Sequence, residues 1–246
     1  MKRSSPSSRK PTSAHAKSGR LGRGLRRLLR ASLHAFLAFC ALSLVQVLFV
    51  RFVNPPLTLS MLGQVWDRWR LEDDVRGYSY APIAWDRMGP DLPAAAVASE
   101  DARFWSHHGF DTEAIAAAWE ANQDGGKVRG GSTISQQAAR NLFLWQDRSW
   151  LRKGLEAWYT LWLEALVPKQ RILELYLNVA ETGPAQFGVE AGARHWYGVS
   201  ARKLSADQAR RLVGILPSPR KWTPTGKMAS KRAAWIARNP APPPEG

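Results

Sequence analysis

Two adjacent acids, Glu100 and Asp101, follow an alanine-rich run and begin the segment EDARFWSHHG. A carboxylate that follows an apolar helical run is partly desolvated, and such a carboxylate is suited to act as a general base. A solvated helix end, with both acids in surface ion pairs, is compatible with the same spacing. The local pattern therefore makes Glu100 a candidate base and leaves the solvated helix end open.

A second candidate segment runs from residue 130 to residue 141 and reads GGSTISQQAARN. Two glycines let a backbone approach a ligand closely, and the free N–H groups of a helix start favour an anion such as phosphate. The pair Gln136 and Gln137 supplies neutral donors and acceptors of the kind that sugar hydroxyls and amides need. A simple turn before a capped helix is the alternative interpretation.

Positive charge is concentrated in the next stretch, where four cations fall within fourteen residues: Arg140, Arg148, Arg152 and Lys153. Guanidinium groups form planar forks that match phosphate oxygens. Arg152 and Glu156 also stand four residues apart, a spacing at which a surface ion pair contributes about 0.3–0.5 kcal/mol to a helix. The segment is thus either a phosphate clamp or an ordinary charged helix face.

Helices must position these residues, and we expect them at about 93–102, 112–122, 133 onward, 150–167, 169–178 and 205–216. Thr133 and Gln136 have the spacing of a capping box, and Ser149 is placed to cap the next helix. Along that helix five large apolar residues recur at intervals of three or four, which predicts a core-facing stripe. They are Leu151, Leu155, Trp158, Trp162 and Leu166. No convincing alternating strand is found, so the predicted fold class is mainly α.

Residues 31–50 form an uncharged run of twenty residues rich in Leu, Phe, Val and Ala. At about 1.5 Å per residue, a helix of this length spans roughly 30 Å, the hydrocarbon thickness of a bilayer. Arg51 follows directly, which favours an uncleaved transmembrane helix over a cleaved signal peptide. Ten basic residues and no acid precede the run, so the positive-inside rule predicts a cytoplasmic amino terminus and an exported remainder.

The formal net charge of +15 is unevenly distributed. Residues 208–244 carry eight basic residues and no acid, whereas residues 31–207 hold 17 basic and 19 acidic residues. This distribution argues against a nucleic-acid-binding protein, because the segment between the two basic ends is close to neutral. The single cysteine, Cys40, excludes an intramolecular disulfide and a cysteine-based zinc site.

Four motifs occur in order along the chain: ED-x-x-F-x-x-H-x-G at 100–109, GGSTI-x-QQ at 130–137, RK-x-x-E at 152–156 and K-x-x-ILE-x-YLN at 169–178. A fifth, GVEAGA at 188–193, is followed by Tyr197 and Gly198. The ordered set resembles that of the peptidoglycan glycosyltransferase family, found in monofunctional biosynthetic transglycosylases and in class A penicillin-binding proteins. Because the signatures of a penicillin-binding transpeptidase are absent from the sequence, the chain is similar to the monofunctional enzymes.

The resemblance implies a lysozyme-like helical domain that polymerises lipid II into β-1,4 glycan strands and releases undecaprenyl pyrophosphate. Glu100 matches the catalytic glutamate, which is implied to deprotonate the 4-hydroxyl of the acceptor sugar. Glu156 matches the second glutamate, which orients cations, helps to hold a divalent metal or assists the leaving group. The implied substrate-binding residues are Ser132, Gln136, Gln137, Arg140, Arg148, Arg152 and Lys153. Position 140 departs from the family, which usually has Lys there, so the phosphate geometry does not carry over directly.

No cofactor is required by the resemblance, which leaves open a divalent cation, Mg or Mn, on the substrate pyrophosphate. The expected partners are lipid II, the growing glycan strand and the membrane, with proteins of cell-wall elongation or division left open. The expected location is the bacterial inner membrane, with a single-pass anchor and a periplasmic catalytic domain. Two other functions stay open: a lysozyme-like hydrolase or lytic transglycosylase, against which the cation cluster argues, and a membrane-anchored scaffold.

We predict five segments in the chain. They are a basic disordered cytoplasmic arm (1–30), a transmembrane helix (31–50), a juxtamembrane segment (51–80), the glycosyltransferase domain (81–220) and a basic, proline-rich carboxy-terminal tail (221–246). All twelve tryptophans lie between Trp66 and Trp235, and some could sit at a bilayer interface rather than in the core. The sequence leaves open whether residues 54–90 pack on the domain or lie on the membrane.

Overall fold

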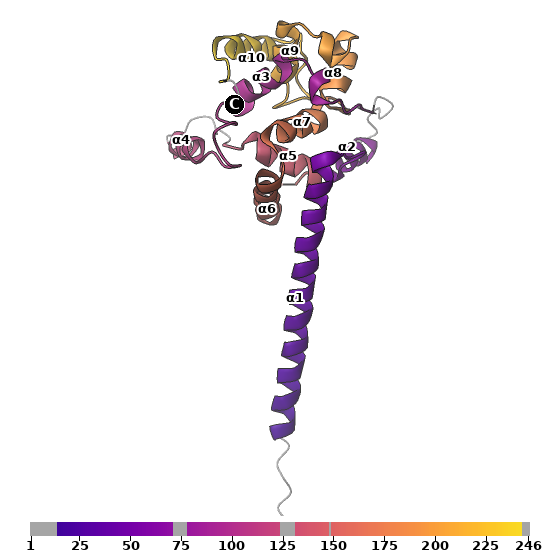
Figure 1. Ribbon diagram of the computed structural model, residues 1–246, viewed down its shortest axis with the longest axis vertical. Helices are drawn as coiled ribbons and strands as arrows, with labels where there is room; N and C mark the ends of the chain where they lie inside the picture. Colours follow the sequence, from indigo (N-terminus) through magenta and orange to yellow (C-terminus); the bar gives the residue numbers. More distant parts are fainter. Residues whose placement is uncertain (1–13, 71–77, 124–130, 148, 243–246) are drawn as a thin grey trace, which may run out of the picture. The chain divides into compact units, whose positions relative to one another are not determined.

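Helix α1 (Ala14–Phe52) begins the part of the chain that the computed structural model describes, which is residues 14–70, 78–123, 131–147 and 149–242. The chain divides into two units, Met1–Val45 and Gln46–Gly246, and α1 supplies the first (Figure 1). Within the described residues, Gly24–Phe52 is the one helical stretch long and apolar enough to cross a membrane. It contains the predicted transmembrane run. The arm predicted to be disordered is helical from Ala14, whereas residues 1–13 lie outside the described residues.

Short helices make up most of the carboxy-terminal unit (46–246). They are α2 (Leu59–Arg70), α3 (Asp91–Glu100), α4 (Thr112–Gln123), α5 (Ile134–Phe143), α6 (Trp150–Leu166), α7 (Lys169–Val179), α8 (Val189–Tyr197), α9 (Ala206–Gly214) and α10 (Lys227–Arg238). Two 3₁₀ turns, η1 (Trp85–Arg87) and η2 (Ala201–Lys203), complete the helical elements of the described residues. The prediction of a mainly α fold is confirmed, although α2, α8 and α10 were not among the expected helices.

Local capping signals explain why the expected helices begin where they do. Thr133 caps α5, since its Oγ1 accepts the Gln136 N–H at 3.2 Å and the Gln136 Oε1 accepts the Thr133 N–H at 3.0 Å. The Ser149 hydroxyl accepts the Arg152 N–H at 3.3 Å at the start of α6. A second capping box starts α9, between Ser205 and residue 208. Each cap is expected to contribute about 1 kcal/mol to stability.

A small sheet of three short strands was not predicted. Strands β1 (Ser79–Tyr80), β3 (Gln186–Phe187) and β2 (Glu181–Gly183) lie in that order, with β1 parallel and β2 antiparallel to β3. Strands of two or three residues are too short to show a detectable alternation in sequence. Gly188 follows β3 with a φ of 87°, and a Cβ there would lie 2.6 Å from the Asn178 carbonyl oxygen.

The core is built around α5 and α7, which lie next to each other in the middle of the carboxy-terminal unit (Figure 1). Ile134, Leu163 and Ile172 are fully buried there. Helix α3 packs on α9, and α9 packs on α10. Asn178 joins α7 to the segment before α3, because its side-chain amide donates to the Ile83 carbonyl and accepts the Ile83 N–H, both at 2.9 Å. The site residues are therefore carried on a single packed core.

The last turns of α1 belong to this core and not only to the anchor. Val47 and Val50 are buried in it. The Tyr159 hydroxyl on α6 donates to the Gln46 Oε1 at 2.6 Å, and the Arg171 guanidinium on α7 donates to the Val50 carbonyl at 2.9 and 3.1 Å. Residues 46–52 are thus an integral part of the carboxy-terminal unit.

The core-facing stripe predicted on helix α6 is confirmed except at its first residue. Four of its residues are partly buried and pack against the core, whereas Leu151 is 69% exposed; the four are Leu155, Trp158, Trp162 and Leu166. The residues that α6 buries are Arg152, Glu156, Tyr159, Thr160 and Leu163. Helix α6 thus has a partly buried apolar face and, next to it, a buried face that includes Arg152 and Glu156. These two charged side chains can be buried because they form an ion pair with each other.

Helix α10 corrects the predicted end of the domain at residue 220. The segment predicted to be a tail contains α10, whose Ala229, Ala233 and Ile236 are buried against α9 and α3. Its small and apolar residues recur at helical spacing, which the surrounding positive charges obscured. The domain therefore includes residues 227–238, and deleting residues 218–246 would remove part of the core.

Candidate active site

Glu100 is the last residue of α3, and its side chain is 13% exposed. Its Oε1 accepts hydrogen bonds from the Ser99 hydroxyl at 3.0 Å and from the Arg232 Nη2 at 2.8 Å. The carboxylate borders a hollow of about 300 Å³, here called the Glu100 hollow, which is also lined by Ser132, Thr133 and Trp235. Glu100 is therefore held at a defined position with limited access to water, as a general base requires.

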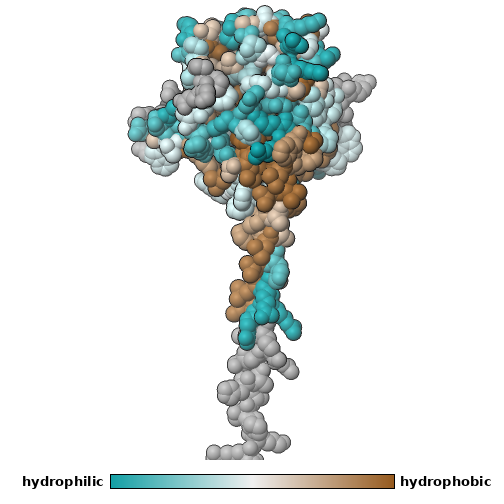
Figure 2. Space-filling view, viewed as in Figure 1, coloured by the Kyte–Doolittle hydropathy of each residue, from teal (hydrophilic) through white to brown (hydrophobic). Residues whose placement is uncertain are grey.

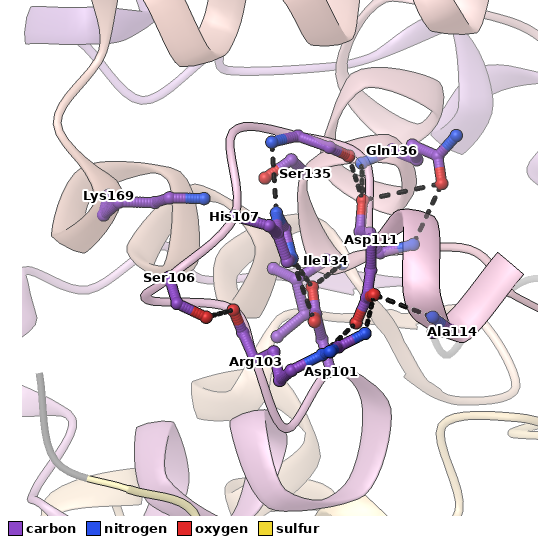
Figure 3. A network of polar contacts seen from close by, with 12 residues as sticks. Asp101, Arg103, Ser106, His107, Asp111, Ala114, Ile134, Ser135, Gln136 and Lys169 are labelled. Carbon is purple, nitrogen blue, oxygen red and sulfur yellow. Dashed lines mark hydrogen bonds and ion pairs between the residues drawn. The ribbon is translucent and has the colours of Figure 1, made fainter.

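Asp101, its neighbour, is buried and has a structural role. Its carboxylate accepts the Ile134 N–H at the start of α5 at 2.9 Å and lies 2.9 Å from the His107 Nε2. The His107 Nδ1 accepts the Gly109 N–H at 3.1 Å, so the proton is on Nε2 and is donated to Asp101 (Figure 3). One carboxylate thus joins the end of α3 to the start of α5.

The loop after Asp101 is fixed at several further points. The Thr133 hydroxyl donates to the Gly109 carbonyl at 2.6 Å. Gly109 has a φ of 89°, and a Cβ there would lie 2.8 Å from the Thr160 Cγ2 and 2.9 Å from the Glu164 Cγ. Phe104 is fully buried, and the Lys169 ammonium lies 4.5 Å from its ring centroid. The motif at 100–109 therefore contains residues that border the Glu100 hollow, Glu100 among them, and residues that hold the loop in place.

A second ion pair supports the same loop from the side of α4 (Figure 3). The Arg103 Nε donates to the Asp111 Oδ2 at 3.0 Å, and the Asp111 Oδ1 caps α4 by accepting the Ala114 N–H at 2.8 Å. Burial acts to raise the pKa of Asp111, but the hydrogen bonds from Arg103 and Ala114 outweigh it and lower the pKa. Asp111 therefore stabilises the loop in its ionised form.

The two candidate glutamines occupy different places. Gln136 is buried, and its side-chain oxygen closes the capping box with Thr133, so the structure ties it to the helix start. Gln137 instead borders a larger hollow of about 730 Å³, here called the arginine hollow, which is also lined by Arg140, Arg152, Tyr176 and Arg220. Ser132 faces the Glu100 hollow. The expected substrate-binding residues are therefore divided between two hollows.

Cations dominate the arginine hollow. The Arg140 Nε is buried without a hydrogen-bond partner, and no ion pair joins Arg140 to an acid in the described part of the chain. Arg152 is almost fully buried, and its guanidinium pairs with the Glu156 carboxylate at 2.6 Å. Arg220 contacts both carboxylate oxygens of Glu181 at 3.1 Å. Arg140 is thus a cation of this hollow whose charge is not neutralised by a described acid.

Glu156 is 2% exposed and does not face either hollow directly. Its second oxygen pairs with the Lys153 ammonium, which is 41% exposed. The arrangement favours one of the three roles considered for Glu156, the orientation of cations. Arg148 lies outside the described residues.

Tyr176 and Arg232 were not among the predicted site residues. Tyr176, on α7, is fully buried, and its hydroxyl donates to the Gln137 Oε1 at 3.5 Å. Burial first, and then the negative charge of Glu100, raise its pKa well above the ordinary value, while the positive charge of Arg140 acts in the opposite direction. Tyr176 therefore lies within electrostatic range of both hollows. The tyrosine of the YLN motif was the available signal for it, whereas Arg232 lay in the predicted tail.

No group of three or more His, Cys, Asp or Glu residues is placed to hold a metal ion within the described ranges. The carboxylates that line the arginine hollow are those of Asp147 and Glu181, and Glu181 is paired with Arg220. These side chains do not fit a resident divalent cation.

Comparison with known proteins agrees with this geometry. The family model described as "Transglycosylase" matches residues 73–240. The chain is 48% identical over 224 residues to a protein of Xanthomonas campestris pv. campestris (strain B100), covering 90% of this chain and 91% of the relative. It is 46% identical over 220 residues to one of Pseudomonas aeruginosa, covering 86% and 92%. It is also 47% identical over 215 residues to one of Pseudomonas fluorescens (strain SBW25), covering 86% and 89%.

The chain belongs to the transglycosylase family. All three relatives are named biosynthetic peptidoglycan transglycosylase. The predictions of a peptidoglycan glycosyltransferase and of a mainly α, lysozyme-like domain are thereby confirmed. The family match also runs through α10, in agreement with the corrected end of the domain.

Proposed function

We propose that this protein polymerises lipid II into β-1,4 glycan strands for cell-wall biosynthesis, with Glu100 as the catalytic base. The observation that carries the proposal is that the domain holds both a largely buried carboxylate, Glu100, beside one hollow and a second hollow lined by cations. Ser132 and Thr133 at the start of α5 border one hollow, and Gln137 and Arg140 border the other. Thr133 and Arg140 are seven residues apart, which is about 10 Å along a helix, a distance that suits a sugar and its pyrophosphate.

In the proposed reaction, the 4-hydroxyl of the acceptor sugar lies in the Glu100 hollow. Glu100 takes the hydroxyl proton while the oxygen attacks the anomeric carbon of the donor chain. The bond from that carbon to the pyrophosphate oxygen breaks, and undecaprenyl pyrophosphate leaves with the bonding electrons. Attack opposite to the leaving group converts an α-linked donor into a β-linked product.

The arginine hollow is the proposed site of the leaving pyrophosphate. Arg140 and Arg152 stabilise the negative charge that develops as the bond breaks, because fixed cations need no rearrangement during the reaction. Lys153 and Glu156 hold Arg152 in place through the shared ion pair. Arg148 and Gln136 stay predictions from the resemblance. A hydrolase acting on a neutral glycan has no use for such cations, which favours the polymerase over the lytic alternative.

We infer that α1 anchors the chain in the inner membrane, with its amino terminus in the cytoplasm and its enzymatic domain in the periplasm. The basic residues before the apolar part of α1 support this orientation. Lipid II and the growing strand are the inferred substrates.

The decisive test is polymerisation of labelled lipid II by the full chain and by Glu100→Gln, with product length as the readout. We expect Glu100→Gln to keep its circular dichroism spectrum and to lose polymerisation. Glu120→Gln is the matched control, because Glu120 is exposed on α4 and borders neither hollow. Full activity of Glu100→Gln contradicts the catalytic assignment. Release of muropeptides from finished sacculi by the wild-type protein would instead favour the lytic function.

A charge-matched pair of variants tests the arginine hollow. Arg140→Gln should weaken polymerisation, whereas Arg238→Gln, at an exposed position of α10, should leave it unchanged. Arg140→Lys restores the charge without the planar fork, so its activity reports whether bidentate geometry matters. If all three variants polymerise lipid II as fast as the wild-type protein does, Arg140 is excluded from the pyrophosphate site.

A further inference from the structure

Helix α2 has one face that is apolar and exposed. Leu59, Leu62, Trp66 and Trp69 are 54%, 49%, 54% and 60% exposed. Their intervals of three, four and three residues place them on one side of a helix. The Trp66 and Trp69 rings are 5.0 Å apart, and the Arg70 guanidinium lies 5.8 Å from the Trp66 ring centroid. Four large apolar side chains thus form a continuous stripe without a protein partner in the described unit.

The opposite face of α2 is fastened to the domain by Met61, which is fully buried in the core, and by the buried polar residues Ser60 and Gln64. The Gln64 amide donates to the Ser60 hydroxyl at 3.0 Å, and the Gln146 amide donates to the same hydroxyl at 2.6 Å. The Arg220 guanidinium donates to the Gln64 Oε1 at 2.7 Å. Because this inner face is held by several contacts, the outer apolar stripe is presented in a fixed orientation.

The chain also restricts where α2 can lie. The apolar span ends at Phe52, and α2 begins at Leu59, so seven extended residues reach at most about 25 Å. Phe52, Val53 and Leu57, between the two helices, are exposed apolar residues as well. Figure 2 shows hydrophobic side chains gathered where the last turns of α1 emerge from the unit. Exposed apolar residues thus follow one another along the chain from the end of α1 to the stripe on α2.

We propose that the outer face of α2 lies in the interfacial region of the lipid bilayer, parallel to its surface. Tryptophan is enriched at this depth because its ring is apolar and its N–H can meet a headgroup. An amphipathic helix with arginine beside the aromatic face binds such an interface. The same helix therefore packs on the domain with one face and on lipid with the other.

One consequence concerns the substrate, and it rests on the proposed function, whereas the membrane contact does not. Gln64 of α2 and Arg220 both line the arginine hollow. If α2 lies among the headgroups, the cations of this hollow are at the depth of a lipid-linked pyrophosphate. Such a substrate reaches the hollow by lateral movement, without leaving the bilayer.

Depth can be measured on the full chain reconstituted in vesicles of phosphatidylethanolamine and phosphatidylglycerol. In a Cys40→Ser background, Leu62→Cys is labelled with an environment-sensitive fluorophore, and quenching by lipids carrying nitroxide on the acyl chain is recorded. Met228→Cys, exposed on α10, is the control. We expect a blue-shifted, quenched label at residue 62 and a water-like, unquenched label at residue 228. A water-like label at residue 62 overturns the proposal. A blue shift at residue 62 that disappears when the protein is diluted in the membrane also overturns it, because it would indicate contact with a second copy of the chain.

A functional comparison separates this proposal from the proposed activity. The double variant Trp66→Gln, Trp69→Gln should lose quenching at residue 62 and lose polymerisation of lipid II embedded in vesicles, while retaining polymerisation in detergent. Met228→Gln, an apolar-to-Gln change at the control position, should retain both. If the wild-type protein polymerises nothing, the proposed function fails while the quenching result still decides the membrane contact. Unchanged quenching in the double variant contradicts the role of the two tryptophans.

Discussion

Replacing Asp101 with Asn turns one carboxylate oxygen into a donor at a place where two donors already point. The carboxylate accepts the Ile134 N–H and the His107 Nε2–H, both at 2.9 Å, and its side chain is 2% exposed. Both donors reach Oδ2, and the His107 Nε2 also lies 3.0 Å from Oδ1, so an asparagine that keeps its oxygen at the Oδ2 position places its NH2 donor against the His107 N–H. If His107 changes tautomer, its Nδ1–H faces the Gly109 N–H instead. One buried donor is therefore left unpaired in either arrangement.

An unpaired buried donor costs about 1–3 kcal/mol, and losing the charged acceptor costs about 1 kcal/mol more, so Asp101→Asn should lower the free energy of unfolding by about 2–4 kcal/mol. At about 2–4 °C per kcal/mol for a domain of this size, the melting midpoint should fall by about 4–16 °C. Glu100→Gln removes only a partly exposed ion pair with Arg232, so it should change the stability by about 1 kcal/mol or less.

The assay compares thermal unfolding, followed by circular dichroism, with polymerisation of lipid II at a temperature where both variants are folded. Glu100→Gln should lose about 10²–10⁴-fold in rate with a nearly unchanged midpoint, because a general base contributes that much. Asp101→Asn should show the opposite pattern, a lower midpoint with most of its activity retained. An unchanged midpoint for Asp101→Asn, or a loss of rate in the folded protein as large as that of Glu100→Gln, would refute the division of roles.

Three further results are expected. Arg232→Gln should lower kcat about tenfold with little change in KM, because Glu100 loses the donor that positions it. A tenfold loss corresponds to about 1.4 kcal/mol of transition-state stabilisation. Steady-state kinetics measure this change, and Arg232→Lys should partly restore kcat. Gly188→Ala should destabilise the fold by about 1–3 kcal/mol, because the φ of Gly188 is 87° and an added Cβ would lie against a carbonyl oxygen. Gly154→Ala should stabilise the fold by about 0.5–1 kcal/mol, because Gly154 lies within α6 with open space around it. Urea unfolding measures both changes. The lowered pKa of Asp111 contributes stability that is fully present above the ordinary pKa of 3.8 and is lost as the pH falls through the folded-state pKa. The urea midpoint of the wild-type protein should therefore decline below about pH 5, and in Asp111→Asn this decline should be less steep.

Signals that act over three or four residues were sufficient to predict most helices near the site. Thr133 and Gln136 form the capping box that their spacing indicates, and Ser149 caps α6 as expected. The motifs also indicated Glu100 and Arg140 as candidate site residues. The distance between Glu100 on α3 and Arg140 on α5 could not be predicted, because it depends on how these helices pack with α7.

Contacts between distant residues account for what the sequence could not predict. Arg232 meets Glu100 across 132 positions, and nothing near residue 232 indicates that contact. The periodicity of α6 indicated its partly buried apolar residues but not the burial of Arg152 and Glu156 beside them. The spacing of these two residues indicated their ion pair, whereas their burial depends on how the rest of the fold packs on α6. The short strands gave no periodic signal at all.

The packing of Val47 and Val50 into the domain bears on how this enzyme can be engineered or can exchange parts in evolution. A chimaera that joins a foreign anchor at Phe52 would lose two core side chains and the Gln46 amide that accepts the Tyr159 hydroxyl. A junction at Val45 would leave all of these contacts intact. The interchangeable anchor of this protein therefore ends inside a continuous helix, seven residues before the helix itself ends.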